Sequence, residues 1–261
     1  MNVLVFDIET IPDVETGRRL YGKHGFMEKL SDEEVARVMY QQRNQESNGQ
    51  TEILRHHLQK VVTISAVLRI GERLRVDSFG TADSKEAEII QQFFKTIQHY
   101  TPMLVSWNGG GFDLPVLHYR ALKHGIQAER YWNIHGNFRF DNYLNRFHER
   151  HTDLMDVLAA YQPRAYASLD DIATMLGFPG KLGMSGDKVW ETYLQEGGIQ
   201  KIRDYCETDV LNTYLIFLRF ELIRSHLNET EYTQECQRVH KLLVDGSIKA
   251  HFQEFLTAWK L

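Results

Sequence analysis

The stretch V3-L-V-F-D-I-E-T-I-P-D13 places two carboxylates, Asp7 and Glu9, inside an apolar run near the start of the chain. Its Val, Leu, Phe and Ile residues predict a β-strand over residues 2–8, flanked by other strands of a sheet. Because side chains two residues apart in a strand point to the same side, Asp7 and Glu9 project together. Two neighbouring anions repel unless they reach solvent, share a proton or meet a cation such as Mg²⁺. Taken alone, the pair is also compatible with a solvated strand end.

The composition is that of an ordinary folded protein. Of 261 residues, 43% are hydrophobic and 25% are charged, so we expect one α/β domain over residues 1–261. No apolar run approaches the ~18 to 20 residues that cross a bilayer, and no signal segment is evident, so we expect a cytoplasmic protein without membrane contact. The net charge of −5 gives no global positive field, so any nucleic-acid binding must be local. Neither the two cysteines nor the histidines show the spacing of a zinc site.

Hydrophobic periodicity predicts a mixed sheet covered by helices. Two further strands, residues 61–70 and 73–79, are expected to join at Gly71-Glu72, and a third covers residues 103–107. The expected helices span residues 84–100, 114–123, 168–176, 187–195 and 199–225. The order of these elements favours a mixed sheet over a purely parallel one.

Two helical additions to this core are expected. The polar segment 14–57 contains S31-D-E-E34, which is typical of a helix start, and is interpreted as a helical insertion after the first strand. Residues 228–261 are interpreted as a C-terminal helical extension. Its end carries an apolar stripe interpreted as packing surface, with docking of a protein partner as the alternative. The stripe consists of Ile248, Phe252, Phe255, Leu256 and Trp259.

A second motif, S106-W-N-G-G-G-F-D-L-P-V-L117, lies between an expected strand and an expected helix. Its glycines let the backbone adopt positive φ and approach a ligand closely. Asp113 could also be no more than the N-cap of the following helix. A P-loop is excluded because no G-K-[ST] follows the glycines.

A third motif, K201-I-R-D-Y-C-E-T-D-V-L-N-T-Y-L-I-F217, lies on an expected helix. Tyr205 and Asp209 are four residues apart and therefore stack on one face of that helix. The alternative is an amphipathic helix with a half-buried Tyr205 and a solvated Asp209. Asp204 and Glu207 are expected to be ordinary solvated acids, and Cys206 an unremarkable free thiol.

The three motifs together resemble a known family. In this order, F6-D-I-E-T10, N108-x-x-x-F-D113 and Y205-x-x-x-D209 are similar to the exonuclease motifs of the DEDD family, in the subgroup with tyrosine in the last motif. Within it, the chain most resembles a bacterial stand-alone group of predicted 3′-to-5′ exonucleases, which is similar to the proofreading domain of family B DNA polymerases. The resemblance implies an RNase H-like fold, an α/β arrangement with a mixed five-stranded sheet flanked by helices.

The resemblance also implies the site. Four acids would bind two Mg²⁺ or Mn²⁺ ions, and a tyrosine hydroxyl would orient the attacking water. The implied catalytic residues are the metal ligands Asp7, Glu9, Asp113 and Asp209, together with Tyr205. The positions expected to contact substrate are Thr10, Ile11, Asn108, Phe112 and Lys181. For Asn108 a purely local turn role stays open, as does core packing for Phe112.

Two further observations leave alternatives open. Asp153 and Asp156, in H151-T-D-L-M-D156, are rivals to Asp113 as the middle ligand, but Asp113 lies on the matching motif. Residues 118–151 carry six Lys or Arg residues and seven aromatic residues, which could guide a single strand or simply pack on the core.

The expected function is metal-dependent 3′-to-5′ hydrolysis of single-stranded nucleic acid, with DNA favoured. The alternatives are an exoribonuclease or a non-catalytic nucleic-acid-binding domain, and the oligomeric state stays open.

Overall fold

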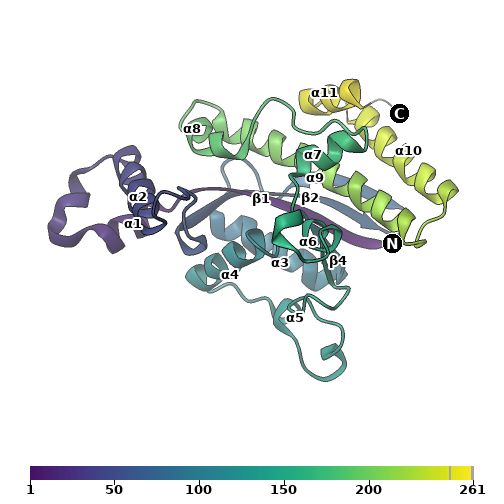
Figure 1. The fold of residues 1–261 in the computed structure, drawn as a ribbon, viewed down its shortest axis with the longest axis horizontal. Helices are drawn as coiled ribbons and strands as arrows, with labels where there is room; N and C mark the ends of the chain where they lie inside the picture. Colours follow the sequence, from purple (N-terminus) through teal and green to yellow (C-terminus); the bar gives the residue numbers. More distant parts are fainter. Residues whose placement is uncertain (247, 260–261) are drawn as a thin grey trace.

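The computed structural model describes residues 1–246 and 248–259, and a five-stranded sheet lies at its centre (Figure 1). The strands are β1 (Asn2–Pro12), β2 (Gln59–Ile70), β3 (Arg73–Ser78), β4 (Met103–Ser106) and β5 (His151–Asp153). Their order is β3-β2-β1-β4-β5, with β1 antiparallel to β2 and parallel to β4. The predicted RNase H-like mixed sheet of five strands is therefore confirmed.

The fifth strand is a sheet element that the periodicity did not locate. β5 has three residues and pairs in parallel with β4, with Ser106 opposite Asp153. Three residues are too few to show an alternating pattern, so only the pairing with β4 defines this strand.

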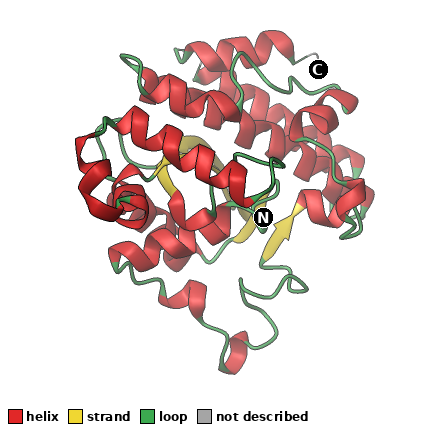
Figure 2. Ribbon diagram, turned by 60° about the vertical axis from the view of Figure 1, so that its left-hand side comes forward, coloured by secondary structure: helices red, strands yellow, loops and turns green. Residues whose placement is uncertain are grey.

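Helices cover both faces of the sheet, as Figure 2 shows. They are α1 (Val14–Tyr21), α2 (Asp32–Glu46), α3 (Glu86–Tyr100), α4 (Asp113–His124), α5 (Glu129–Trp132), α6 (Leu154–Leu158), α7 (Leu169–Met175), α8 (Val189–Tyr193), α9 (Gly198–Ile223), α10 (Glu229–Asp245) and α11 (Ala250–Ala258). The helices predicted over residues 84–100, 114–123, 168–176 and 199–225 are thus confirmed within a few residues at each end. The helix predicted over 187–195 is a 3₁₀ turn (Gly186–Lys188) followed by the short α8. No helix in the described ranges is long and apolar enough to cross a membrane.

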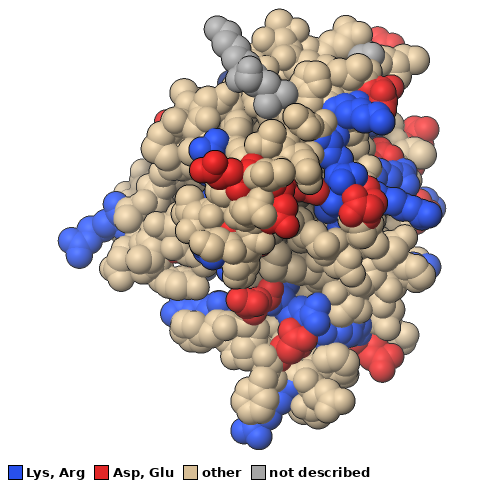
Figure 3. Space-filling view, turned by 90° about the vertical axis from the view of Figure 1, so that its right-hand side faces the viewer, with Lys and Arg blue, Asp and Glu red and all other residues tan. Residues whose placement is uncertain are grey.

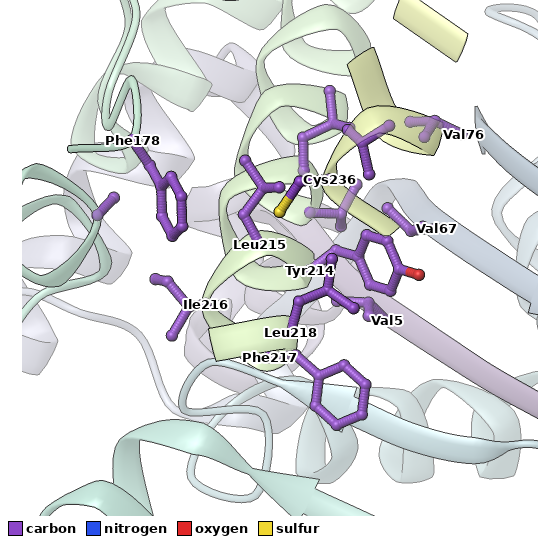
Figure 4. Close-up of a cluster of buried hydrophobic side chains, with 14 of the residues drawn as sticks. Val5, Val67, Val76, Phe178, Tyr214, Leu215, Ile216, Phe217, Leu218 and Cys236 are labelled. Atoms are coloured by element: carbon purple, nitrogen blue, oxygen red, sulfur yellow. The ribbon is translucent and has the colours of Figure 1, made fainter. Parts of the chain in front are cut away.

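The sheet divides two hydrophobic cores, and the alternation of side chains along β1 assigns residues to each. Val3 and Val5 pack on the side of α9, α10 and α11, where Figure 4 shows Val5 next to Tyr214. Leu4, Phe6 and Ile8 pack on the side of α3 and α4. Burying each of these large side chains stabilises the fold by roughly 1.5–3 kcal/mol. Asp7 and Glu9 share the parity of Val3 and Val5 and therefore face α9.

The segment 14–57 contains α1 and α2 and projects from one end of the sheet (Figure 1). Ser31 caps α2 through a capping box with Glu34, as the sequence predicts. A small hydrophobic cluster packs this segment together with the residue that follows it, and consists of Met27, Val35, Met39, Leu54 and Leu58. Arg120 on α4 ties the segment to the core, because its buried guanidinium contacts both Asp13 and Glu86.

The C-terminal helices pack against α9, and the buried residues of the apolar stripe confirm its interpretation as packing surface. Phe252, Phe255 and Trp259 are buried in the core that contains α9. Ile248 is an exception, because 96% of it is exposed. The last two residues of the expected extension lie outside the described residues.

Glu207 corrects the prediction of a solvated acid. The residue is 2% exposed, and its carboxylate accepts hydrogen bonds from Ser78 at 2.9 Å and from Lys249 at 2.9 Å. Nε2 of His251 donates a third hydrogen bond at 2.8 Å. Glu207 therefore joins α9 to β3 and to the start of α11.

Candidate active site

The first two acids stand on β1, on the face that α9 covers. Glu9 is 8% exposed and lies opposite Thr63 of β2, whereas Thr10 lies opposite Val61. Val62 is thus an extra residue on β2, and it forms a β-bulge directly after Glu9. Bulges bend a strand and re-aim its side chains, and they are frequent beside active sites. The bulge ends the regular ladder at the point where the two acids stand.

Asp113 joins these acids from the first turn of α4. The residue that caps this helix is Phe112, so the capping interpretation of Asp113 is wrong. Oδ1 of Asp113 instead accepts a hydrogen bond from the backbone N–H of Ile8 at 3.1 Å. The last pair between β1 and β4 is Val5 with Val105, so the ladder stops before it reaches Ile8. Asp113 therefore hydrogen-bonds the backbone of β1 just beyond the last residue that pairs with β4.

A glycine turn brings α4 to this position. Asn108 has φ of 61°, and a Cβ on Gly109 would lie 2.3 Å from Oγ of Ser106, so the turn packs tightly on the end of β4. Asp153, at the end of β5, accepts hydrogen bonds from the N–H groups of Asn108 at 2.9 Å and Gly110 at 2.8 Å. Asp153 thus holds the turn that precedes Asp113.

Helix α9 contributes three neighbouring side chains, Tyr205, Cys206 and Asp209. All three are buried, and Oδ1 of Asp209 has no hydrogen-bond partner among the described residues. The thiol of Cys206 donates a hydrogen bond to Oδ2 of Asp7 at 3.3 Å, and these two side chains lie within 4.8 Å of a carboxylate oxygen of Glu9. The prediction that Cys206 is unremarkable was therefore wrong. Cysteine content alone carried no signal for this contact.

Burial raises the pKa values of all four acids, and repulsion by the other acids of the set adds to this shift for Asp7 and Glu9. Burial, followed by the charges of Asp113 and Asp209, raises the pKa of Asp7 well above its usual value. Burial and the charge of Asp7 do the same for Glu9. Burial raises the pKa of Asp113 to about 7 and that of Asp209 to about 6. The folded protein therefore stabilises the ionised form of these carboxylates less well than water does.

The comparisons with known proteins identify the family. Residues 51–259 match the model of a family described as "Predicted 3'-5' exonuclease related to the exonuclease domain of PolB". The chain belongs to this family. Asp113, Tyr205 and Asp209 lie within the residues that match this predicted exonuclease family, whereas Asp7 and Glu9 precede them. The expectation of an enzyme of the 3′-to-5′ exonuclease class is thus confirmed, and nucleic acid is the substrate class that the family implies.

A DNA polymerase of Archaeoglobus fulgidus is a more distant relative of this exonuclease chain. The two are 30% identical over 140 residues, which cover 50% of this chain and 17% of the polymerase. The chain therefore spans less than a fifth of the polymerase's length.

The five positions expected to contact substrate have different surroundings in this exonuclease. Lys181 lies close enough for its charge to act on Glu9 and Asp209, against the effect of burial on their pKa values. Thr10 is half-buried and donates a hydrogen bond to Oε1 of Gln59 at 2.9 Å. Ile11 is buried in a hydrophobic cluster with Val62. Contact of these residues with substrate stays a prediction.

Asn108 and Phe112 frame the glycine turn. Asn108 adopts the left-handed conformation that the turn requires, consistent with the local role left open for it. Phe112 is half-buried against the core on the α4 side, and its ring centroid lies 5.7 Å from that of His56. Their predicted role in shaping the substrate pocket stays untested.

The aromatic segment 118–151 has a mixed role. Tyr131 and Tyr143 are 1% and 2% exposed and stack on each other in the core. Phe140 and Phe147 are largely exposed, and the guanidinium of Arg139 lies 5.3 Å above the ring of Phe140. Part of the segment is thus core, and guidance of a single strand by its exposed rings stays a prediction.

Proposed function

We propose that this chain is a metal-dependent 3′-to-5′ exonuclease that removes nucleotides from the 3′ ends of single-stranded nucleic acid, with DNA favoured. One observation carries the proposal. Acids from three separated elements, β1, α4 and α9, lie close enough for their negative charges to act on one another, and three of them, Glu9, Asp113 and Asp209, are buried. Such an arrangement costs stability unless cations join it.

The donor set fits divalent metal ions. All four proposed ligands, Asp7, Glu9, Asp113 and Asp209, offer hard carboxylate oxygens, which Mg²⁺ and Mn²⁺ prefer. Oδ1 of Asp209 is buried without a hydrogen-bond partner in the described structure. Buried polar atoms usually have a partner, and a bound cation would supply one here. Two such ions, when bound, would supply the positive charge that activates an attacking water and stabilises the leaving 3′ oxygen.

The remaining side chains of the site hold protons and orient groups. Burial and nearby carboxylates raise the pKa of the Tyr205 hydroxyl, so it stays protonated and can donate a hydrogen bond to an attacking water. Burial likewise raises the pKa of the Cys206 thiol, which stays neutral and orients Asp7. In this proposal, Lys181 contacts a substrate phosphate, which its proximity to Glu9 and Asp209 supports. The mechanism needs no nucleophile from the protein.

The substrate must reach this site without a global electrostatic pull. The net charge is −5, and Figure 3 shows basic and acidic side chains interspersed on the face that it displays. The polymerase relative supports DNA, whereas discrimination against RNA would depend on contacts to the 2′-hydroxyl. The presence of all four acids and Tyr205 argues against a non-catalytic binding domain.

A time course with 5′-labelled single-stranded DNA and RNA tests the proposal. We expect progressive shortening from the 3′ end with Mg²⁺ or Mn²⁺ and none with EDTA. Asp7→Asn should lower the rate by at least ~10²-fold, because a metal site stabilises the transition state by several kcal/mol. Asp204→Asn, on α9 but outside the four acids, is the matched control and should retain activity. Unchanged degradation by folded Asp7→Asn would reject the assignment, and degradation of RNA alone would overturn the DNA preference.

A further inference from the structure

A cavity of about 540 Å³ lies between the segment 14–57 and α4, and none of the four acids contributes to its lining. This volume falls in the range of small-molecule sites. The lining residues are Arg43, Thr51, Ile53, Leu54, Arg55, His56, His57 and Tyr119. The cavity therefore needs both the inserted segment and the core helix for its formation.

One residue of the cavity lining, His56, also contacts the glycine turn of the proposed active site. Nε2 of His56 donates a hydrogen bond to the carbonyl oxygen of Gly111 at 3.0 Å, and the His56 ring contacts Phe112. Gly111 and Phe112 directly precede Asp113 in the chain. A ligand in the cavity would thus lie beside the turn that carries one of the four acids.

The lining combines positive charge with an accessible ring. None of the lining residues is acidic, and the side chain of Arg55 is 56% exposed. Glu46 lies outside the lining and pairs with Arg55 at 3.1 Å, so it offsets part of this charge. Tyr119 is 49% exposed and meets the ring of His57 edge-on at 6.0 Å. Arginines that follow phosphates and exposed rings that stack on bases are the two elements of single-strand binding.

A second cavity, of about 620 Å³, lacks this relation to the site. It lies between β3 and α3, and Arg75 and Tyr100 contribute to its lining. Arg75 is paired with Asp77, which also lines that cavity. The lining includes neither the acids nor the glycine turn, so this cavity serves as the internal comparison.

We propose that the cavity between the segment 14–57 and α4 binds a nucleotide of the single-stranded substrate on the 5′ side of the scissile phosphate. Tyr119 stacks on the base, and Arg55 holds a phosphate. This assignment rests on the proposed exonuclease function. It makes the inserted segment part of the substrate-binding surface, although its residues before 51 lie outside the family match.

Steady-state kinetics of the double variant Arg55→Ala/Tyr119→Ala test the assignment. Both side chains are exposed, so the fold should survive, which thermal unfolding checks. With a single-stranded 12-mer, we expect KM to rise ~5- to 100-fold while kcat changes less than twofold, because stacking and phosphate contacts bind the strand. The slope of log(kcat/KM) against log[salt] should become shallower by ~0.7 for one lost phosphate contact.

Two controls separate the possible outcomes. The p-nitrophenyl ester of thymidine 5′-monophosphate has no upstream nucleotide, so its hydrolysis should be equal in the wild type and the double variant. The variant Arg75→Ala/Tyr100→Ala, at the other cavity, should keep wild-type KM for the 12-mer. An unchanged 12-mer KM in the Arg55/Tyr119 variant, or an equal loss with the nitrophenyl ester, would overturn the assignment while leaving the exonuclease function intact. A wild-type protein that degrades neither substrate would instead overturn the proposed function.

Discussion

Asp113 accepts a hydrogen bond from the backbone N–H of Ile8 at 3.1 Å, across 105 residues of sequence. Ile8 lies between Asp7 and Glu9, so this single contact fixes the start of α4 against the strand that carries the first two acids. A carboxylate that accepts a backbone hydrogen bond through one oxygen can still bind a ligand through the other. The contact anchors Asp113, to which the proposed function assigns a second role as a metal ligand.

Replacement of Asp113 by Asn separates these two roles. The amide oxygen of Asn can still accept from Ile8, so the fold should persist, while loss of the charge should lower the exonuclease rate by at least ~10²-fold. Burial raises the pKa of Asp113 to about 7, so the neutral Asn should not lower thermal stability at pH 8. Rates at saturating Mn²⁺ and thermal unfolding at pH 8 provide the measurements. Activity within threefold of wild type would show that Asp113 is only an anchor.

Replacement of Tyr205 by Phe tests the hydroxyl that is proposed to orient water. The buried ring is retained, so we expect kcat to fall about 10- to 100-fold through loss of orientation, with little change in stability. Tyr214→Phe on the same helix is the matched control. It loses a hydrogen bond to Glu235 at 3.2 Å and should cost about 1 kcal/mol of stability without loss of activity. Equal losses of kcat in both variants would place the effect in the helix rather than in the hydroxyl.

The contribution of Asp113 and Asp209 to the stability of the metal-free protein should fall as pH rises. The raised pKa values, about 6 for Asp209 and about 7 for Asp113, mean that the folded state binds more protons than the unfolded state above the ordinary value of 3.8. Their contribution to the free energy of unfolding therefore decreases from about pH 4 to pH 7. Cations replace the protons, so Mn²⁺ should raise the melting temperature more at pH 8 than at pH 5.

Thermal unfolding in EDTA and in Mn²⁺ at both pH values measures this linkage. The variant Asp113→Asn/Asp209→Asn should lose the part of the stability decrease between about pH 4 and pH 7 that these two acids cause, and should respond less to Mn²⁺. An identical Mn²⁺ shift at pH 5 and pH 8 in the wild type would contradict the coupling of these protons to the cation.

Replacement of Gly109 by Ala tests the turn before α4. The new Cβ would lie 2.3 Å from Oγ and 2.5 Å from Cβ of Ser106, so the turn must shift. We expect a loss of ~1–3 kcal/mol in stability and, through displacement of Asp113, a ~10²-fold loss of rate. Addition of Ser106→Gly removes both clashing atoms and should restore part of the activity. The explanation fails if Gly109→Ala alone leaves the rate and the melting temperature unchanged.

Local patterns were enough to predict the elements that carry the site. Alternating or helical periodicity located β1, α4 and α9, and the order of the three motifs agreed with the family that the comparisons identify. The same patterns missed Asp153 as the residue that holds the glycine turn, because its partners Asn108 and Gly110 are more than 40 residues away. They also assigned Glu207 to the surface, because an acid has the same local signal whether a distant Lys249 reaches it or not.

The amino-acid sequence by itself determined that Asp7 and Glu9 share one side of a strand and that Tyr205 and Asp209 stack on one side of a helix. These relations follow from the repeat of each backbone conformation within a few residues. Only the tertiary structure decided that these two sides face each other. It also decided that Asp113 hydrogen-bonds Ile8 where a residue of β4 would otherwise pair, and that the segment 14–57 lines a cavity beside the glycine turn. Contacts such as that between Cys206 and Asp7, 199 residues apart, arise only when the sheet and its helices pack, because no local repeat connects such distant residues.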